Sequence, residues 1–186
     1  MKWWGWGHPD VSFPMHERPK LWPWIESKLG AKHEAKDAII ELDKIILNQL
    51  NLNPGFMQEL SQVLPAENIL WSHEERVSHS YGKSYPDLLR IRKGIIKSAP
   101  DVVVYPQSHE EVLSLVQLAV KYHVKLIPFG GGTNIVGALE VKDQSSMNVS
   151  VDMRKMKRLL KIDEVSQRAT IEAGILGPEL EEELNK

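Results

Sequence analysis

The chain has 186 residues, of which 42% are hydrophobic and 26% charged, and its formal net charge is -2. This balance is typical of globular proteins and argues against disorder, a fibrous protein or a general nucleic-acid binder. The chain has no cysteine, which excludes disulfides, thiolate metal sites and cysteine nucleophiles, and no apolar run approaches the roughly 20 residues of a membrane span. We therefore expect a cytoplasmic protein.

The first 24 residues hold five of the six tryptophans, interleaved with glycines and prolines. Because the prolines interrupt a regular helix, this opening predicts an extended arm whose indoles pack on the body of the protein. A contact with a membrane surface is the alternative, since indole favours the lipid headgroup level. The five are Trp3, Trp4, Trp6, Trp22 and Trp24.

Two helices are predicted next, from Glu34 to Leu50 and from Phe56 to Leu64, because apolar residues recur there at three- and four-residue spacing. The segment from Trp71 to Gly94 is polar and mixed, and its histidines lack the spacing of a zinc pair. It predicts a solvated loop rather than a metal site. We expect residues 1–95 to form an N-terminal arm and helical region, and residues 96–186 to form a second domain.

The pattern changes at Pro100. A β-branched run from Val102 to Tyr105 predicts a buried strand, and Ser108 with Glu111 predicts a capping box that starts a helix ending at Tyr122. A second apolar run, Val124 to Ile127, follows at once. Strand, helix and strand so closely connected predict a right-handed βαβ unit with parallel strands.

A loop of three glycines leaves the second of these strands, with the sequence Pro128, Phe129, Gly130, Gly131, Gly132, Thr133 and Asn134. Glycine lets a ligand approach the backbone closely, and converging N–H groups bind anions such as phosphate. A flexible surface turn is the alternative. Its position at the carboxyl end of a parallel strand favours a binding loop. The spacing matches neither a Walker loop nor the Rossmann fingerprint.

Three further strands are predicted, Asn148 to Met153, Arg158 to Ile162 and Arg168 to Ala173, as an antiparallel meander beside the βαβ unit. Gly177 and Pro178 open a last helix. The basic residues between positions 154 and 161 predict a charged hairpin turn rather than a nucleic-acid contact.

These motifs, in this order, resemble the FAD domain of the flavoproteins related to vanillyl-alcohol oxidase. The stretches that show this resemblance are P-D-V-V-V-Y-P from Pro100, P-F-G-G-G-T-N from Pro128 and I-E-A-G-I from Ile171. The opening M-K-W-W-G-W-G and the stretches R-V-S-H-S-Y-G and L-L-R-I-R-K-G are similar to one subfamily, the alkyldihydroxyacetonephosphate (alkylglycerone-phosphate) synthases. Phe129 and Asn134 depart from that family, which more usually has an aliphatic residue and serine there.

The resemblance implies an α+β fold, the PCMH-type (p-cresol methylhydroxylase) FAD-binding domain, present in part and preceded by the arm and helices. It implies FAD held at Pro128 to Asn134, and a transferase that exchanges the acyl group of acyl-dihydroxyacetone phosphate for a fatty alcohol in ether-lipid synthesis. The family's catalytic groups correspond to positions beyond Lys186, so no catalytic residue is assigned and no metal is expected.

Two alternatives to this function stay open, an FAD-dependent 2-hydroxy-acid oxidase or dehydrogenase and a non-catalytic remnant. The resemblance is also compatible with peripheral membrane contact, a homodimer and, in a eukaryote, a peroxisomal location.

Overall fold

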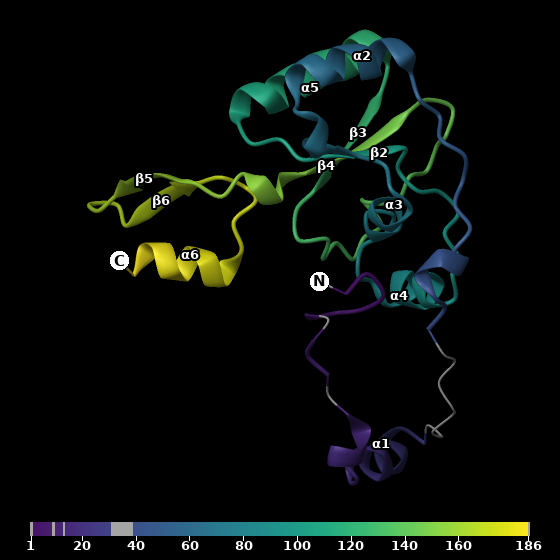
Figure 1. Ribbon diagram of the computed structural model, residues 1–186. Coiled ribbons are helices and arrows are strands. Elements are labelled where there is room, and N and C mark those ends of the chain that lie inside the picture. The colour runs from purple at the N-terminus through teal and green to yellow at the C-terminus, as the bar shows by residue number, and fades with distance from the viewer. Residues whose placement is uncertain (1, 9, 13, 31–38, 186) are drawn as a thin grey trace.

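The computed structural model describes residues 2–8, 10–12, 14–30 and 39–185. Figure 1 shows a body of sheet and helices, a hairpin with a helix beside it, and one N-terminal helix that lies apart. The helices are α1 (Leu21–Leu29), α2 (Pro54–Val63), α3 (His73–Ser78), α4 (Tyr85–Arg92), α5 (His109–Tyr122) and α6 (Gly177–Leu184). The strands are β1 (Ile69–Leu70), β2 (Val102–Val104), β3 (Lys125–Phe129), β4 (Asn148–Asp152), β5 (Leu159–Asp163) and β6 (Arg168–Ile171).

The central sheet has the order β1-β2-β4-β3. Strand β4 pairs in parallel with both β2 and β3, and β1 adds an antiparallel edge. The predicted βαβ unit is confirmed in its elements, β2, α5 and β3, but β4 lies between its two strands. The predicted meander is wrong at this strand, because all five residues of β4 are buried and a central parallel position covers both of its faces.

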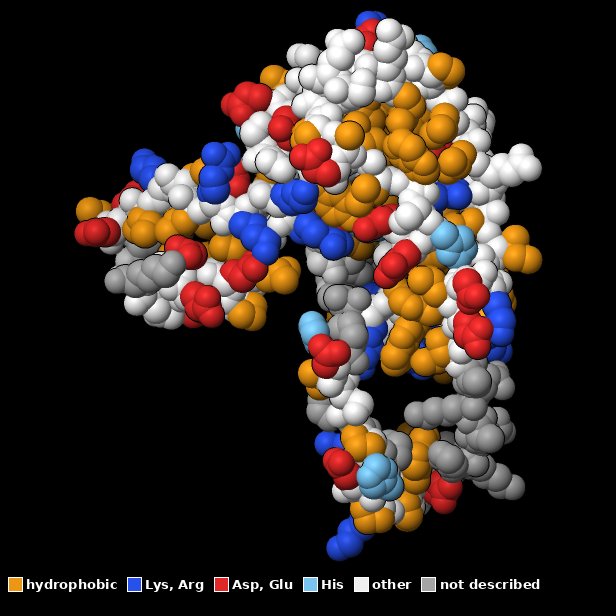
Figure 2. Space-filling model, viewed as in Figure 1, with side chains coloured by type: hydrophobic (Ala, Val, Ile, Leu, Met, Phe, Trp, Pro, Cys, Tyr) orange, Lys and Arg blue, Asp and Glu red, His pale blue; other side chains and the backbone are white. Residues whose placement is uncertain are grey.

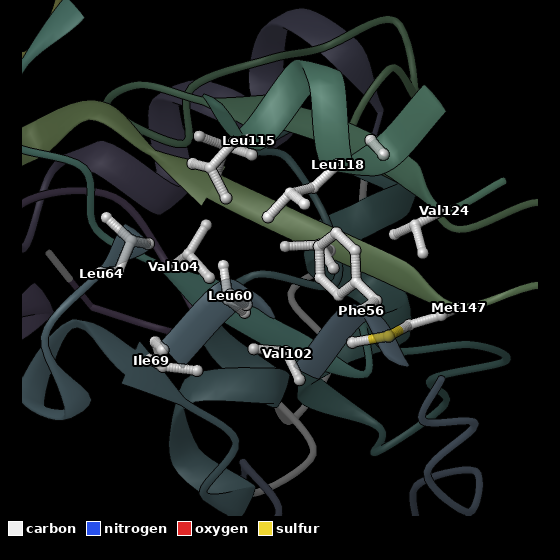
Figure 3. Packing of buried hydrophobic residues seen from close by; sticks show 13 residues of the cluster. Phe56, Leu60, Leu64, Ile69, Val102, Val104, Leu115, Leu118, Val124 and Met147 are labelled. Atoms are coloured by element: carbon white, nitrogen blue, oxygen red, sulfur yellow. The ribbon is translucent and has the colours of Figure 1, made fainter. Parts of the chain in front are cut away.

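The main core lies between the sheet and the helices α2 and α5, which run side by side over one face (Figure 1). Figure 3 shows Phe56 and Leu60 of α2 meeting Leu115 and Leu118 of α5 above the strands. Both helices were predicted, and both have capped starts. Asn53 accepts from the Phe56 N–H and Ser108 accepts from the Glu111 N–H, which satisfies donors that the first turn leaves unpaired.

A second, smaller core lies on the opposite face, under α3 and α4. It buries Ile45, Val77, Tyr81, Ile91, Ile96 and Ala99. Residues on successive strand positions point to alternate faces, so β4 sends Val149 and Val151 into the main core and Asp152 toward α3.

The predicted helix from Glu34 to Leu50 is wrong over residues 39–50, and its first five residues lie outside the described residues. One short 3-10 turn, Leu42–Lys44, interrupts an irregular chain there. The backbone finds tertiary partners in place of helical ones, because His73 bonds the Ile45 carbonyl at 2.7 Å and Arg76 bonds the Asn48 carbonyl at 2.9 Å. Ile40, Leu42, Ile45 and Leu47 contact the second core, whereas Ile46 is exposed.

The segment from Trp71 to Gly94 is not the solvated loop that its polarity predicts. It forms α3 and α4, capped by Ser72 and Ser84, and buries Arg76 and His79. These polar side chains are buried because each finds partners; Arg76, for example, donates to the Pro100 carbonyl at 2.8 Å. Helix α4 ends with the basic residues Arg90 and Arg92 in its last turn.

The tryptophan-rich opening divides into two parts. Residues 2–7 are irregular and lie on the body, where the Lys2 and Trp3 carbonyls accept from Lys83, as predicted for a packed arm. Trp22 and Trp24 instead belong to helix α1, which contradicts the expectation of no helix here. Pro23 falls in the first turn of α1, where a missing N–H leaves no bond unmade.

Strands β5 and β6 form a separate antiparallel hairpin, and α6 begins at Gly177–Pro178 as predicted. The basic run lies at the base of this hairpin, not at its turn. Arg158 pairs with Glu172 at 2.6 Å and Lys157 with Glu179 at 2.5 Å. Figure 2 shows this mixture of basic and acidic side chains where the hairpin leaves the body.

Candidate functional site

The site lies where the parallel strands β3 and β4 end. Phe129, the last residue of β3, pairs with Asp152, the last residue of β4, and the glycine loop starts directly after Phe129. The carboxyl edge of a parallel sheet is where ligands bind in open α/β structures. The position of the loop directly after β3 therefore places it at the ligand-binding edge of the sheet.

The three glycines of the loop differ in how much space a side chain would have. Gly132 has a φ of +68°, and a Cβ atom there would lie 2.7 Å from Cζ of Phe129. A Cβ at Gly130 would meet nothing within 4 Å, and one at Gly131 only the Thr133 methyl at 3.8 Å. Gly132 thus keeps the loop in its conformation over the Phe129 ring, whereas Gly130 and Gly131 leave bare backbone facing open space.

The N–H groups of Gly131, Gly132 and Thr133 donate to no acceptor among the described residues. Backbone donors without partners beside open space suit an anion, which can accept several of them at once. The loop therefore has the shape and the donors of a phosphate cradle.

Asn134 and the α3–α4 connection hold the loop from behind. The Asn134 side chain accepts from the N–H groups of Val136 and Ala138, at 3.1 and 3.0 Å, and so closes the turn that follows. Its carbonyl accepts from the Lys83 N–H at 2.7 Å. Gly82 lies against the same peptide, because a Cβ there would be 1.9 Å from the Asn134 carbonyl oxygen.

A cavity of about 410 Å³ opens in front of the loop. Of the seven predicted site residues, Phe129, Gly130, Gly131 and Gly132 line it, whereas Pro128, Thr133 and Asn134 do not. The arm, α3, the end of β4 and the segment before α6 complete the wall. The lining residues that the sequence did not predict as part of the site include Trp3, Glu75, His79, Lys83, Arg154, Lys157 and Gly174.

Asp152 and Arg154 place opposite charges beside the loop. Asp152 is fully buried and accepts from His79 at 2.9 Å and from the backbone and side chain of Arg154 at 2.8 Å. Burial alone would raise the pKa of Asp152, but these hydrogen bonds and the Arg154 charge lower it below its ordinary value. The carboxylate is thus ionised and its three donors fix it in place.

Lys83 is a buried lysine on the opposite wall. Its Nζ donates to the carbonyls of Lys2 and Trp3, each at 3.0 Å, and burial lowers its pKa to about 8, an effect that the charge of Asp87 partly offsets. This side chain ties the N-terminal arm to the segment that holds Asn134. The arm is therefore part of the cavity wall and not a separate appendage.

Gly174, in the I-E-A-G-I stretch, lies where a side chain would not fit. A Cβ there would lie 1.7 Å from the Met153 carbonyl oxygen, and the Gly174 N–H donates to Met156 at 2.8 Å. Only glycine brings residues 173–176 this close to the end of β4, so they form a wall of the cavity.

The cavity suits an anionic, partly aromatic ligand. The glycine loop offers N–H donors, and Arg154 and Lys157 bring positive charge. Trp3 and Phe129 add apolar surface. Glu74 and Glu75 contribute acidic side chains to the wall. Within the part of the chain that the structure describes, no group of three metal-ligating side chains comes together. No described helix has the length and apolarity to cross a membrane.

Comparison with known proteins gives a consistent result. Residues 100–186 match the family described as the FAD binding domain. Over 147 residues the chain is 44% identical to the alkyldihydroxyacetonephosphate synthase of Dictyostelium discoideum, covering 79% of this chain and 24% of that protein. It is 34% identical over its full length to the synthase of Trypanosoma brucei brucei, covering 34% of that protein.

A solved alkyldihydroxyacetonephosphate synthase structure superimposes on 100% of this chain and 38% of its own, with a TM-score of 0.87 and 37% identity. The predicted α+β, PCMH-type FAD-binding fold is thereby confirmed. The chain spans 24% and 34% of the length of the two curated relatives.

Proposed function

Because the chain is a homologue of the alkyldihydroxyacetonephosphate synthases and carries an FAD-binding domain sequence in residues 100–186, we propose that it holds the pyrophosphate of FAD for such a synthase. The observation that carries this proposal is the glycine loop, with open space and unpaired N–H groups at the carboxyl edge of the sheet. The reaction proposed is replacement of the acyl group of acyl-dihydroxyacetone phosphate by a fatty alcohol.

Each part of the cavity has a task under this proposal. The N–H groups of Gly131 and Gly132 donate to phosphate oxygens, and the positive charge of Arg154 offsets the negative charge of the ligand. Trp3 and Phe129 provide apolar walls that keep water away from a planar ring system. Bound FAD supplies the electron-accepting flavin ring, which no side chain can replace.

Titration of the purified 186-residue chain with FAD tests the cofactor assignment. Binding of one FAD per chain, followed by flavin fluorescence, is the expected result. Failure of the folded chain to bind FAD would contradict the proposal. We also propose that this chain alone does not turn over acyl-dihydroxyacetone phosphate, because none of its assigned residues has a role in the chemistry; turnover by the pure chain would show otherwise.

The activity is best measured on protein expressed from the complete gene. Incorporation of labelled fatty alcohol into acyl-dihydroxyacetone phosphate is expected. Reduction of a dye with glycolate or lactate, without alcohol incorporation, would instead establish the 2-hydroxy-acid dehydrogenase alternative.

Peripheral contact with a lipid surface is a further part of the proposal, since the substrates are lipids. Helix α1 exposes Trp24 and Leu29, 59% and 76% of whose surfaces are accessible. Sedimentation with liposomes should fall when both are replaced by alanine. The matched control is the pair Ile46→Ala and Val120→Ala, which also removes exposed apolar side chains but lies outside α1.

A further inference from the structure

His79 stands at the C-terminal cap of α3, with 1% of its side chain exposed, and it reaches the cavity wall behind the glycine loop. Buried histidines need partners for both ring nitrogens. His79 has one on each side, from two different elements. Nδ1 lies 2.7 Å from the Glu75 carbonyl oxygen, and Nε2 lies 2.9 Å from Oδ2 of Asp152.

Neither partner of His79 has a hydrogen to give. A backbone carbonyl only accepts, and the Asp152 carboxylate receives the backbone N–H and the guanidinium of Arg154, which help to lower its pKa and keep it ionised. A neutral imidazole carries one N–H and could satisfy only one of these acceptors. Both contacts are satisfied as hydrogen bonds only when both nitrogens carry a proton.

Two carboxylates face the His79 ring. The Glu75 carboxylate lies 3.5 Å from Nδ1 and also accepts the Tyr105 hydroxyl hydrogen at 2.5 Å. Arg154 is a cation paired with Asp152, at 2.6 Å. An imidazolium at His79 adds a second positive charge between the two carboxylates, directly behind a loop that is to hold a pyrophosphate.

His79 also sets the position of the loop itself. Its ring packs on the Phe129 ring with centroids 4.2 Å apart and planes tilted by 48°. The Phe129 ring in turn lies under Gly132, where it fills the space a Cβ would need. A displacement of the imidazole would therefore move Phe129 and, through it, the N–H groups of the cradle.

We propose that His79 is a positioning residue of the cofactor site, a doubly protonated imidazolium that fixes Phe129 beneath the glycine loop and neutralises Asp152 behind the bound pyrophosphate. This inference rests on the proposed binding of FAD. It adds a role for a residue that touches the loop from behind and lies outside the loop motif.

The protonation state is tested directly by labelling histidine with ¹⁵N in the folded chain. The His79 resonances, assigned by their loss in His79→Gln, should show a proton on both ring nitrogens in the folded chain. A neutral tautomer of His79 at pH 7 would overturn the proposal, whether or not FAD binds.

The positioning role is tested by FAD titration of His79→Gln. The matched control is His109→Gln, at an exposed histidine that does not line the cavity. Circular dichroism first establishes that each variant is folded. We expect His79→Gln to weaken FAD binding by about tenfold or more, because the positive charge behind the loop is then lost, and His109→Gln to leave it unchanged.

Ionic strength separates the charge of His79 from its shape. The loss in His79→Gln should shrink as salt screens the electrostatic interaction, whereas a purely steric loss would be equal at low and high salt. Equal FAD affinity of His79→Gln and wild type, or a loss independent of salt, would overturn the inference. Failure of the wild-type chain to bind FAD would instead refute the proposed function.

Discussion

Replacement of single glycines in the loop separates binding from stability. Gly131 does not have a positive φ, and a Cβ there meets only the Thr133 methyl at 3.8 Å. Gly131→Ala should therefore leave the free energy of unfolding unchanged or raise it by about 0.4–1 kcal/mol, as alanine does at compatible positions. The same methyl group would be added to a residue that lines the cavity.

The expected binding effect of Gly131→Ala is a rise in the FAD dissociation constant of about tenfold or more, which corresponds to at least about 1.4 kcal/mol. Gly132→Ala is the companion variant. Its φ of +68° costs an L residue about 1–2 kcal/mol, and the new Cβ would force the Phe129 ring aside from a 2.7 Å approach. This variant should lose both stability and FAD affinity.

Two measurements on each variant decide the matter, urea unfolding without ligand and FAD titration by flavin fluorescence. A Gly131→Ala variant that is stable and binds FAD as wild type does would refute the assignment of the loop as the pyrophosphate contact. Unchanged stability in Gly132→Ala would refute the account of why that glycine is required.

Three further outcomes are expected. Phe56→Ala, in the main core, should lower the free energy of unfolding by about 3–5 kcal/mol, measured against Leu113→Ala on the exposed face of α5. Lys83 has a pKa of about 8 in the folded chain against an ordinary value of 10.5, so between these pH values the unfolded chain binds more protons than the folded chain. The free energy of unfolding should therefore rise with pH from about 8 to 10.5. Lys83→Met should abolish this rise. Gly174→Ala should strongly destabilise the chain in thermal melts, because its Cβ would collide with the Met153 carbonyl; a melt like that of wild type would show that the close approach is not needed.

Local signals in the sequence predicted the elements that local interactions determine. Ser108 caps α5 through its own side chain, and the valine run of β2 is apolar enough to be buried on both faces. The glycine loop was also predictable, because its position after a strand depends only on chain order. These features need no knowledge of distant residues.

The misassigned features depend on contacts between distant segments. The chain around Ile45 has helical spacing, but His73 and Arg76 take up its carbonyls from 28 residues away. Strand β4 was predicted as the start of a meander, because its own sequence does not specify that it pairs in parallel with a strand on each side. His79 stood in a polar stretch, and only the fold brings Asp152, 73 residues later, to its ring. The other residues of the cavity wall could not be predicted for the same reason, because they come from distant segments of the chain.

The central position of β4 has a consequence for the order of folding. Strands β2 and β3 share no hydrogen bonds, and both pair with β4, which follows them in the chain. The ladder that anchors the glycine loop therefore cannot close until residues 148–152 have left the ribosome. A nascent chain released at position 147 should fail to protect the amides of β3 from hydrogen exchange, whereas one released after position 152 should protect them.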